Sequence, residues 1–280
     1  RKVLALSPGH PKALRVLREG YLAAGDFDGL SELYAELADW DGLAEVLSGA
    51  ADRATDSALK VDLSYRAAAI YEDKLGSSER AFRSYERVLS VKPDDARAVS
   101  ALIPIYQADE KWARLPPLYE VLLSQAEDTS TRVDLLRKLA DVTGQRLGDR
   151  ASAFAYASKL YDIDPGSLDE YEGYAQASGE FASFVQRVRE RAENEGTEKS
   201  ERQALLFKLA QITHDQLGQK DEAIALYKKL VTEYDSAAAM TALDRVLRGG
   251  DRADDLRWLF RLRVDRAAAP EQKTECLMEW

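Results

Sequence analysis

The sequence predicts an all-α solenoid, a superhelix of antiparallel helical hairpins that forms a single domain over residues 1–280. Three similar segments recur at nearly equal intervals along the chain: LGSSERAF from Leu75, LGDRASAF from Leu147 and LGQKDEAI from Leu217. Apolar residues around them recur at the spacing of amphipathic helices, and no segment competes as a strand. Because such periodicity is typical of helical arrays, we expect a repeating unit of two hairpins, or four helices.

Each repeat contains a glycine between two predicted helices, at Gly76, Gly148 and Gly218. Glycine adopts the left-handed conformation without steric cost, so we expect each one to end the first helix of a hairpin. Alanines recur at constant positions before and after these glycines, namely Ala68, Ala140 and Ala210 in the first helices and Ala81, Ala153 and Ala223 in the second. Small side chains let two helices approach closely, so these alanines are predicted to be buried.

The periodicity predicts helices at 10–24, 27–38, 41–53, 57–75, 78–92, 95–108, 111–127, 130–147, 149–163, 166–177, 180–195, 198–217, 219–234, 236–248 and 251–268, with bounds good to about three residues. One helix is additional to the repeating unit. DFDGLSEL from Asp26 and DWDGLAEV from Asp39 are two copies of a shorter repeat, which explains why the segment from Pro8 to Pro93 is longer than that from Pro93 to Pro165.

Two local features modify this pattern. Pro104, Pro116 and Pro117 lack N–H donors, so we expect helix continuity to fail between Leu102 and Leu118. Ser167 and Glu170 have the spacing of a capping box, which predicts that they begin a helix together.

The repeating residues resemble the tetratricopeptide repeat, whose consensus has small residues in the first helix, a turn glycine, an alanine and an aromatic residue in the second helix, and a final proline. The best match in this chain is Ala68, Gly76, Ala81, Tyr85 and Pro93. This resemblance implies a scaffold whose first helices line a concave groove. It also implies that an unidentified protein or peptide binds in this groove.

A basic residue stands at the same position before each repeat glycine, at Arg66, Lys138 and Lys208. The resemblance implies that this column, which we call the basic column, faces the ligand in the groove. A ladder of cations would attract acidic groups of a partner. The alternative is a solvated face in which these side chains form ion pairs within their own helices.

Two neighbouring columns refine this hypothesis. Leu63, Leu135 and Leu205 either add an apolar wall to the groove or belong to the core. Chaperone-binding members of the family clamp a terminal carboxylate with Lys and Asn, but the column that would carry Asn reads Ile70, Val142 and Ile212. The resemblance therefore does not extend to that clamp.

Composition narrows the function classes. Acidic residues outnumber basic ones by 49 to 39, which disfavours binding to nucleic acid phosphates, and no apolar run approaches the ~20 residues that span a bilayer. The usual nucleotide, metalloprotease and hydrolase motifs are absent, and acidic pairs such as Asp94 with Asp95 are read as helix starts. With a single Cys276 and two histidines, we expect no metal site, no cofactor and no enzymatic activity.

The sequence therefore predicts a protein-binding scaffold. The alternative is an architectural solenoid that self-associates or joins domains through its ends, with no peptide groove. Residues 1–6 match the end of a second helix and Trp280 matches the column before the packing alanine, so we expect a segment of a longer array. The compartment stays open, with the cytoplasm slightly favoured.

Overall fold

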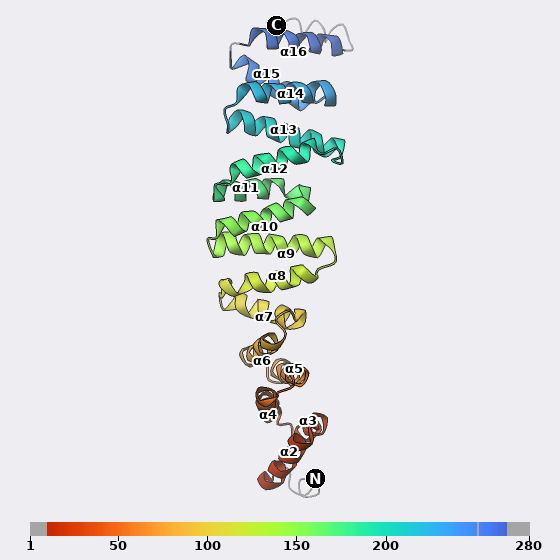
Figure 1. Cartoon of the computed structure of the whole chain (residues 1–280), viewed down its shortest axis with the longest axis vertical. Coiled ribbons are helices and arrows are strands. Elements are labelled where there is room, and N and C mark those ends of the chain that lie inside the picture. The colour runs from red at the N-terminus through yellow and green to blue at the C-terminus, as the bar shows by residue number, and fades with distance from the viewer. Residues whose placement is uncertain (1–9, 251, 268–280) are drawn as a thin grey trace. The chain divides into compact units, whose positions relative to one another are not determined.

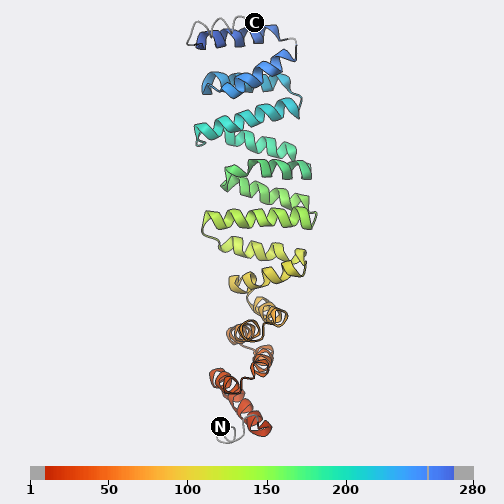
Figure 2. The same ribbon diagram turned by 180° about the vertical axis from the view of Figure 1, so that it is seen from behind.

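The computed structural model describes residues 10–250 and 252–267, and in this part of the chain all regular structure is helical. Pro8, Cys276, Trp280 and the N-terminal residues 1–6 lie outside the described residues. The chain divides into two compact units, residues 1–174 and 175–280. Within each unit, consecutive helices pack side by side (Figures 1 and 2). That both units form one domain stays a prediction.

The helices follow the predicted order and bounds. They are α2 Pro11–Ala24, α3 Phe27–Glu36, α4 Trp40–Arg53, α5 Ser57–Asp73, α6 Ser78–Val91, α7 Ala96–Ala108, the 3₁₀ turn η1 Trp112–Arg114, α8 Leu115–Gln125, α9 Thr129–Asp141, the π-helical turn η2 Val142–Arg146, α10 Arg150–Ile163, the 3₁₀ turn η3 Pro165–Ser167, α11 Leu168–Ser178, α12 Phe181–Glu193, α13 Lys199–Asp215, α14 Lys220–Tyr234, α15 Ala237–Arg248 and α16 Ala253–Arg266. The all-α repeat architecture is confirmed.

The three repeat glycines form the same turn. Gly76, Gly148 and Gly218 have φ values of 59°, 70° and 67°, so all three are left-handed and lie between two helices as predicted. In each turn the amide after the glycine donates to a carbonyl in the last turn of the first helix or just after it, as Ser77 N does to Tyr71 O at 2.7 Å. These bonds satisfy carbonyls that the end of the first helix would otherwise leave without partners.

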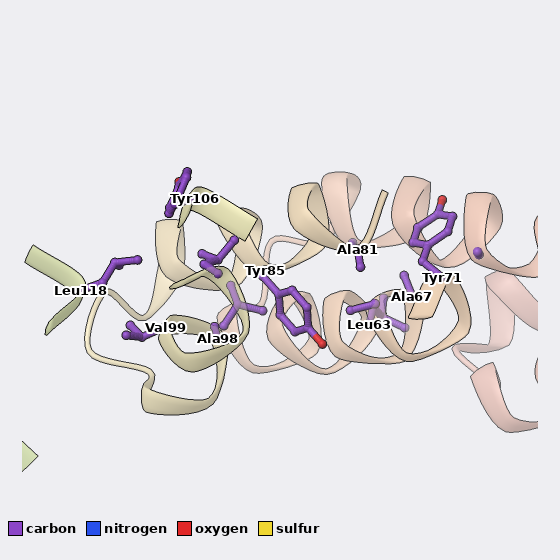
Figure 3. Close-up of a cluster of buried hydrophobic side chains, with 14 of the residues drawn as sticks. Leu63, Ala67, Tyr71, Ala81, Tyr85, Ala98, Val99, Tyr106 and Leu118 are labelled. Carbon is purple, nitrogen blue, oxygen red and sulfur yellow. The ribbon is translucent and has the colours of Figure 1, made fainter. Parts of the chain in front are cut away.

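The predicted alanine contacts are confirmed. All six alanines of the two columns are at most 1% exposed. In the best-matching hairpin, Ala81 of α6 belongs to the same buried cluster as Leu63, Ala67 and Tyr71 of α5 (Figure 3). A side chain larger than a methyl group would hold these two helices apart.

The additional helix near the N-terminus is also confirmed. Among the described residues, five helices (α2 to α6) precede Pro93, whereas four (α7 to α10) lie between Pro93 and Pro165. The two copies of the shorter repeat start α3 and α4 in the same way. Asp26 Oδ1 accepts from Gly29 N at 2.9 Å, and Asp39 Oδ1 accepts from Gly42 N at 3.0 Å.

The proline segment is interrupted, although Pro104 is not the cause. Helix α7 continues through Pro104 to Ala108, and α8 begins at Leu115 after the turn η1. Pro116 and Pro117 lie in the first turn of α8, where backbone amides have no helical acceptor and a proline removes nothing.

The predicted capping box is wrong. Ser167 is buried, and its Oγ donates to the carbonyl of Asp164 at 2.7 Å. The carboxylate of Glu170 instead accepts from Arg137 of α9. The side chain of Glu170, which the sequence pattern had assigned to the helix cap, therefore forms an ion pair with another helix.

The alanine packing makes a testable prediction within α10. Ala153 is fully buried, whereas Ala155 of the same helix is exposed. We expect Ala153→Leu to lower the free energy of unfolding in urea by about 1 to 3 kcal/mol, because the added methyl groups overpack the contact. Ala155→Leu is the matched control and should change it by less than about 0.5 kcal/mol. Equal effects of the two substitutions would contradict the predicted packing.

Candidate interaction surface

The basic column lies on three first helices. Arg66 is in α5 and Lys138 is in α9, both in the unit of residues 1–174, whereas Lys208 of α13 is in the other unit. A single ladder of all three side chains on one concave surface therefore stays a prediction. The environments of the three side chains differ.

Arg66 is held by two aspartates. Its Nη1 lies 2.5 Å from Asp28 Oδ1 of α3, and its Nε lies 2.8 Å from Asp62 Oδ2 one turn earlier in α5. The hydrogen bond with Asp28 is the main cause that raises the pKa of Arg66, and both carboxylate charges add to it. Ligand-facing cations of this column would have charged ends that are unpaired or shared with a bound anion. Arg66 departs from this expectation, because acidic residues of α3 and of its own helix α5 reach it.

Lys138 is the exposed member of the column. Within the described part of the chain it has no carboxylate partner. The preceding residue, Arg137, takes the structural role instead, with its Nε 3.0 Å from Glu170 Oε2 and its Nη2 3.6 Å from Asp164 Oδ2. Lys138 is thus a cation that an acidic partner could reach without displacing an internal ion pair.

Lys208 differs from both. Its side chain is half-buried on α13 and interacts with its surroundings.

The leucine column belongs to the core. Leu63, Leu135 and Leu205 are 0%, 6% and 3% exposed, so they cannot form the wall of an open groove. Of the two interpretations that the sequence left open, core packing is confirmed.

Polar contacts between helices two positions apart were not foreseen from the sequence. Arg80 of α6 pairs with Asp41 of α4, Arg87 of α6 with Asp52 of α4, and Arg189 of α12 with Glu222 of α14. The partners are 39, 35 and 33 residues apart, about one hairpin. Opposite charges at this separation are the sequence signal that could have predicted these contacts.

Asp95 combines a helix cap with a contact between helices two positions apart. It caps α7 by accepting from Ala98 N at 3.1 Å, and it accepts the hydroxyl of Tyr65 from α5. The guanidinium of Arg97 lies 4.4 Å from the centre of the Tyr65 ring. Burial alone would raise the pKa of Asp95, but the bonds from Tyr65 and Ala98 and the charge of Lys92 bring it below its usual value. Asp95 therefore caps the start of α7 and also connects α7 to α5.

Two further properties concern the described residues only. No cluster of three or more histidine, cysteine or acidic side chains is arranged to hold a metal ion there. No helix in that part is long and apolar enough to cross a bilayer.

The repeat is also similar to a known protein family. A family model described as tetratricopeptide repeat matches residues 204–237, which contain most of α13, the turn at Gly218 and α14. The same turn and alanine contacts recur at Gly76 and Gly148. The matched hairpin is similar to the tetratricopeptide repeat, and the described part of the chain has the all-helical repeat architecture that fits such a protein. Tetratricopeptide repeats generally mediate protein–protein interactions, and the family is typically a non-enzymatic scaffold. No curated protein matches the chain.

The environment of Asp95 predicts a pH-dependent stability. A carboxylate whose pKa is lower in the folded state stabilises that state above its unfolded pKa of about 3.9, and this contribution is lost as the pH falls through the folded value. We expect Asp95→Asn, which keeps a capping side chain, to lower the free energy of unfolding at pH 7 by about 1 kcal/mol.

The difference between Asp95→Asn and the wild type should begin to shrink as the pH falls below about 3.9, where the unfolded carboxyl takes up a proton. It should be lost below the lowered folded pKa, where the wild-type carboxyl is protonated in both states. Urea unfolding at several pH values measures this, with the exposed neighbour Asp94→Asn as control. A difference that does not change with pH would show that the charge of Asp95 contributes nothing.

Proposed function

We propose that this tetratricopeptide-like chain is a non-catalytic scaffold that binds an acidic segment of a protein or peptide through the basic column. In the unit of residues 1–174 the contact would use Arg66 and Lys138 on the first-helix face, and Lys208 holds the equivalent repeat position in the other unit. The observation that carries the proposal is the exposed Lys138, which lacks a carboxylate partner among the described residues and occupies the same repeat position as two other cations.

The ion pairs of Arg66 are compatible with this role. The side chain of Asp28 is 83% exposed and that of Arg66 is 37% exposed, so a partner carboxylate could replace Asp28 at little cost. Exposed ion pairs contribute about 0.2 to 1 kcal/mol, which is less than a desolvated contact with a bound partner provides. Arg66 would then exchange the carboxylate of Asp28 for a carboxylate of the partner. Lys138, which has no carboxylate partner among the described residues, would form a new ion pair.

An architectural role is the second candidate. Helix α2 has no fully buried residue in the structure, and its Val16 is 62% exposed. A helix that buries none of its residues against the rest of the described chain favours association through α2, with another subunit or domain. Under this alternative the basic column would have no ligand, and the mass of the protein in solution would rise with concentration.

Selection from a random peptide library displayed on phage tests the proposal. We expect the selected peptides to be enriched in Asp and Glu, and Lys138→Glu to weaken their binding about tenfold. The control is Lys229→Glu, an exposed lysine on the second helix α14, which should change the affinity less than twofold. Added salt should also lower the affinity of the wild type for these peptides, and it should lower the affinity of Lys138→Glu less.

Selected peptides without acidic enrichment, or equal binding by Lys138→Glu and the wild type, would contradict the basic-column proposal. Sedimentation at several protein concentrations separates the two candidates, because only the architectural role predicts an increase in mass without peptide.

A further inference from the structure

Two equivalent clusters lie at hairpin ends in the unit of residues 1–174. In the first, Lys74 Nζ lies 5.1 Å from the centre of the Trp40 ring, and in the second, Arg146 Cζ lies 4.6 Å from the centre of the Trp112 ring. The tryptophan precedes the cation by the same number of positions in both, and the second cluster follows the first at the interval that separates Gly76 from Gly148. The arrangement is thus a property of the repeat.

Each cluster has an apolar neighbour at the turn. Leu75 and Leu147 follow the cations directly and precede the left-handed Gly76 and Gly148. Leu147 is 39% exposed, which is unusual for a leucine in this chain, and Leu75 is half-buried. A tryptophan, a cation and a leucine recur together in the repeat. In the second cluster the cation is arginine and the leucine is exposed, and these are residue types suited to a protein contact.

The cations are available for a partner. Lys74 and Arg146 are exposed, and within the described residues neither forms an ion pair. Many other arginines of the two units are paired with carboxylates, as Arg80 is with Asp41 and Arg137 is with Glu170. A cation that rests on an indole ring retains its hydrogen-bond donors for an external carboxylate.

We propose that these two clusters, which we call the turn-edge clusters, are docking points for an acidic partner segment that carries aliphatic or aromatic side chains. The carboxylates of that segment bind Lys74 and Arg146, and its apolar side chains contact the tryptophans and leucines. The inference rests on the scaffold role proposed above but not on the basic column, because the clusters lie at the turns of the hairpins.

The third repeat provides an internal control. Leu217 occupies the position of Leu147 and is 42% exposed, but Gln216 stands where the other copies have the cation, and Phe181, the first residue of α12, corresponds to the tryptophan. This copy therefore has the apolar side chain without the cation on an indole ring. If apolar exposure alone were sufficient, substitutions at Leu147 and Leu217 would act equally.

The test uses a synthetic labelled helical peptide with Leu at every third or fourth position and Glu elsewhere, and a matched peptide with Lys in place of Glu. Binding is measured by fluorescence anisotropy. We expect Arg146→Gln, which installs the residue of the third copy, to raise the Kd of the acidic peptide about five- to tenfold. Leu147→Ser should raise it about threefold, whereas Leu217→Ser and Lys229→Gln should leave it within twofold of the wild type.

Unfolding in urea distinguishes a purely structural role of the clusters from a role in binding. Exposed cation–π contacts contribute little to stability, so Arg146→Gln should fold as the wild type does at the temperature of the binding assay. The inference is overturned if the wild type shows no binding of the acidic peptide below about 1 mM. It is overturned equally if the Lys-containing peptide binds as tightly, or if Arg146→Gln and Leu147→Ser leave the Kd unchanged.

Comparison with Lys138→Glu distinguishes the two proposals. Loss of peptide binding in Lys138→Glu but not in Arg146→Gln would remove the turn-edge inference and keep the proposed function. The reverse result would move the binding surface from the basic column to the hairpin turns.

Discussion

Close packing between the two helices of a hairpin is the contact on which the remaining structure depends. It requires alanine at the facing positions, where Ala81, Ala153 and Ala223 are fully buried. It also requires a turn short enough to return the chain at once, which the left-handed glycines provide. Once each first helix packs in this way, its leucines are buried in the core, and only its polar residues are accessible to a partner.

A second set of contacts decides which of those polar residues can act on a partner. Ion pairs and tyrosine–carboxylate bonds join helices about one hairpin apart, as between Arg66 and Asp28 or Tyr65 and Asp95. These contacts engage cations of both the first and the second helices, such as Arg66 in α5 and Arg80 in α6, and at the same time fix neighbouring hairpins to one another. Lys138, Lys74 and Arg146 are outside these ion pairs among the described residues, which is why both proposals concern them.

The helical repeat could be predicted from the sequence because its determinants are local. A glycine between two amphipathic segments and alanines at constant offsets specify a hairpin whatever lies elsewhere in the chain. The pairing of Arg66 with Asp28 and of Glu170 with Arg137 could not be predicted in the same way, since each depends on how successive hairpins are placed. Pro104 was misjudged for a related reason, because the context of α7 accommodates a residue that local propensity excludes.

Substitution of two glycines tests the left-handed turn most directly. Gly148 has φ of 70° with open space where a methyl group would be added, whereas Gly173 lies inside α11 with equally open space and no positive φ. We expect Gly148→Ala to lower the free energy of unfolding by about 1 kcal/mol, and Gly173→Ala to raise it by about 0.4 to 1 kcal/mol. If Gly148→Ala is neutral or stabilising in urea unfolding, the turn is not left-handed and the account of the hairpin is wrong.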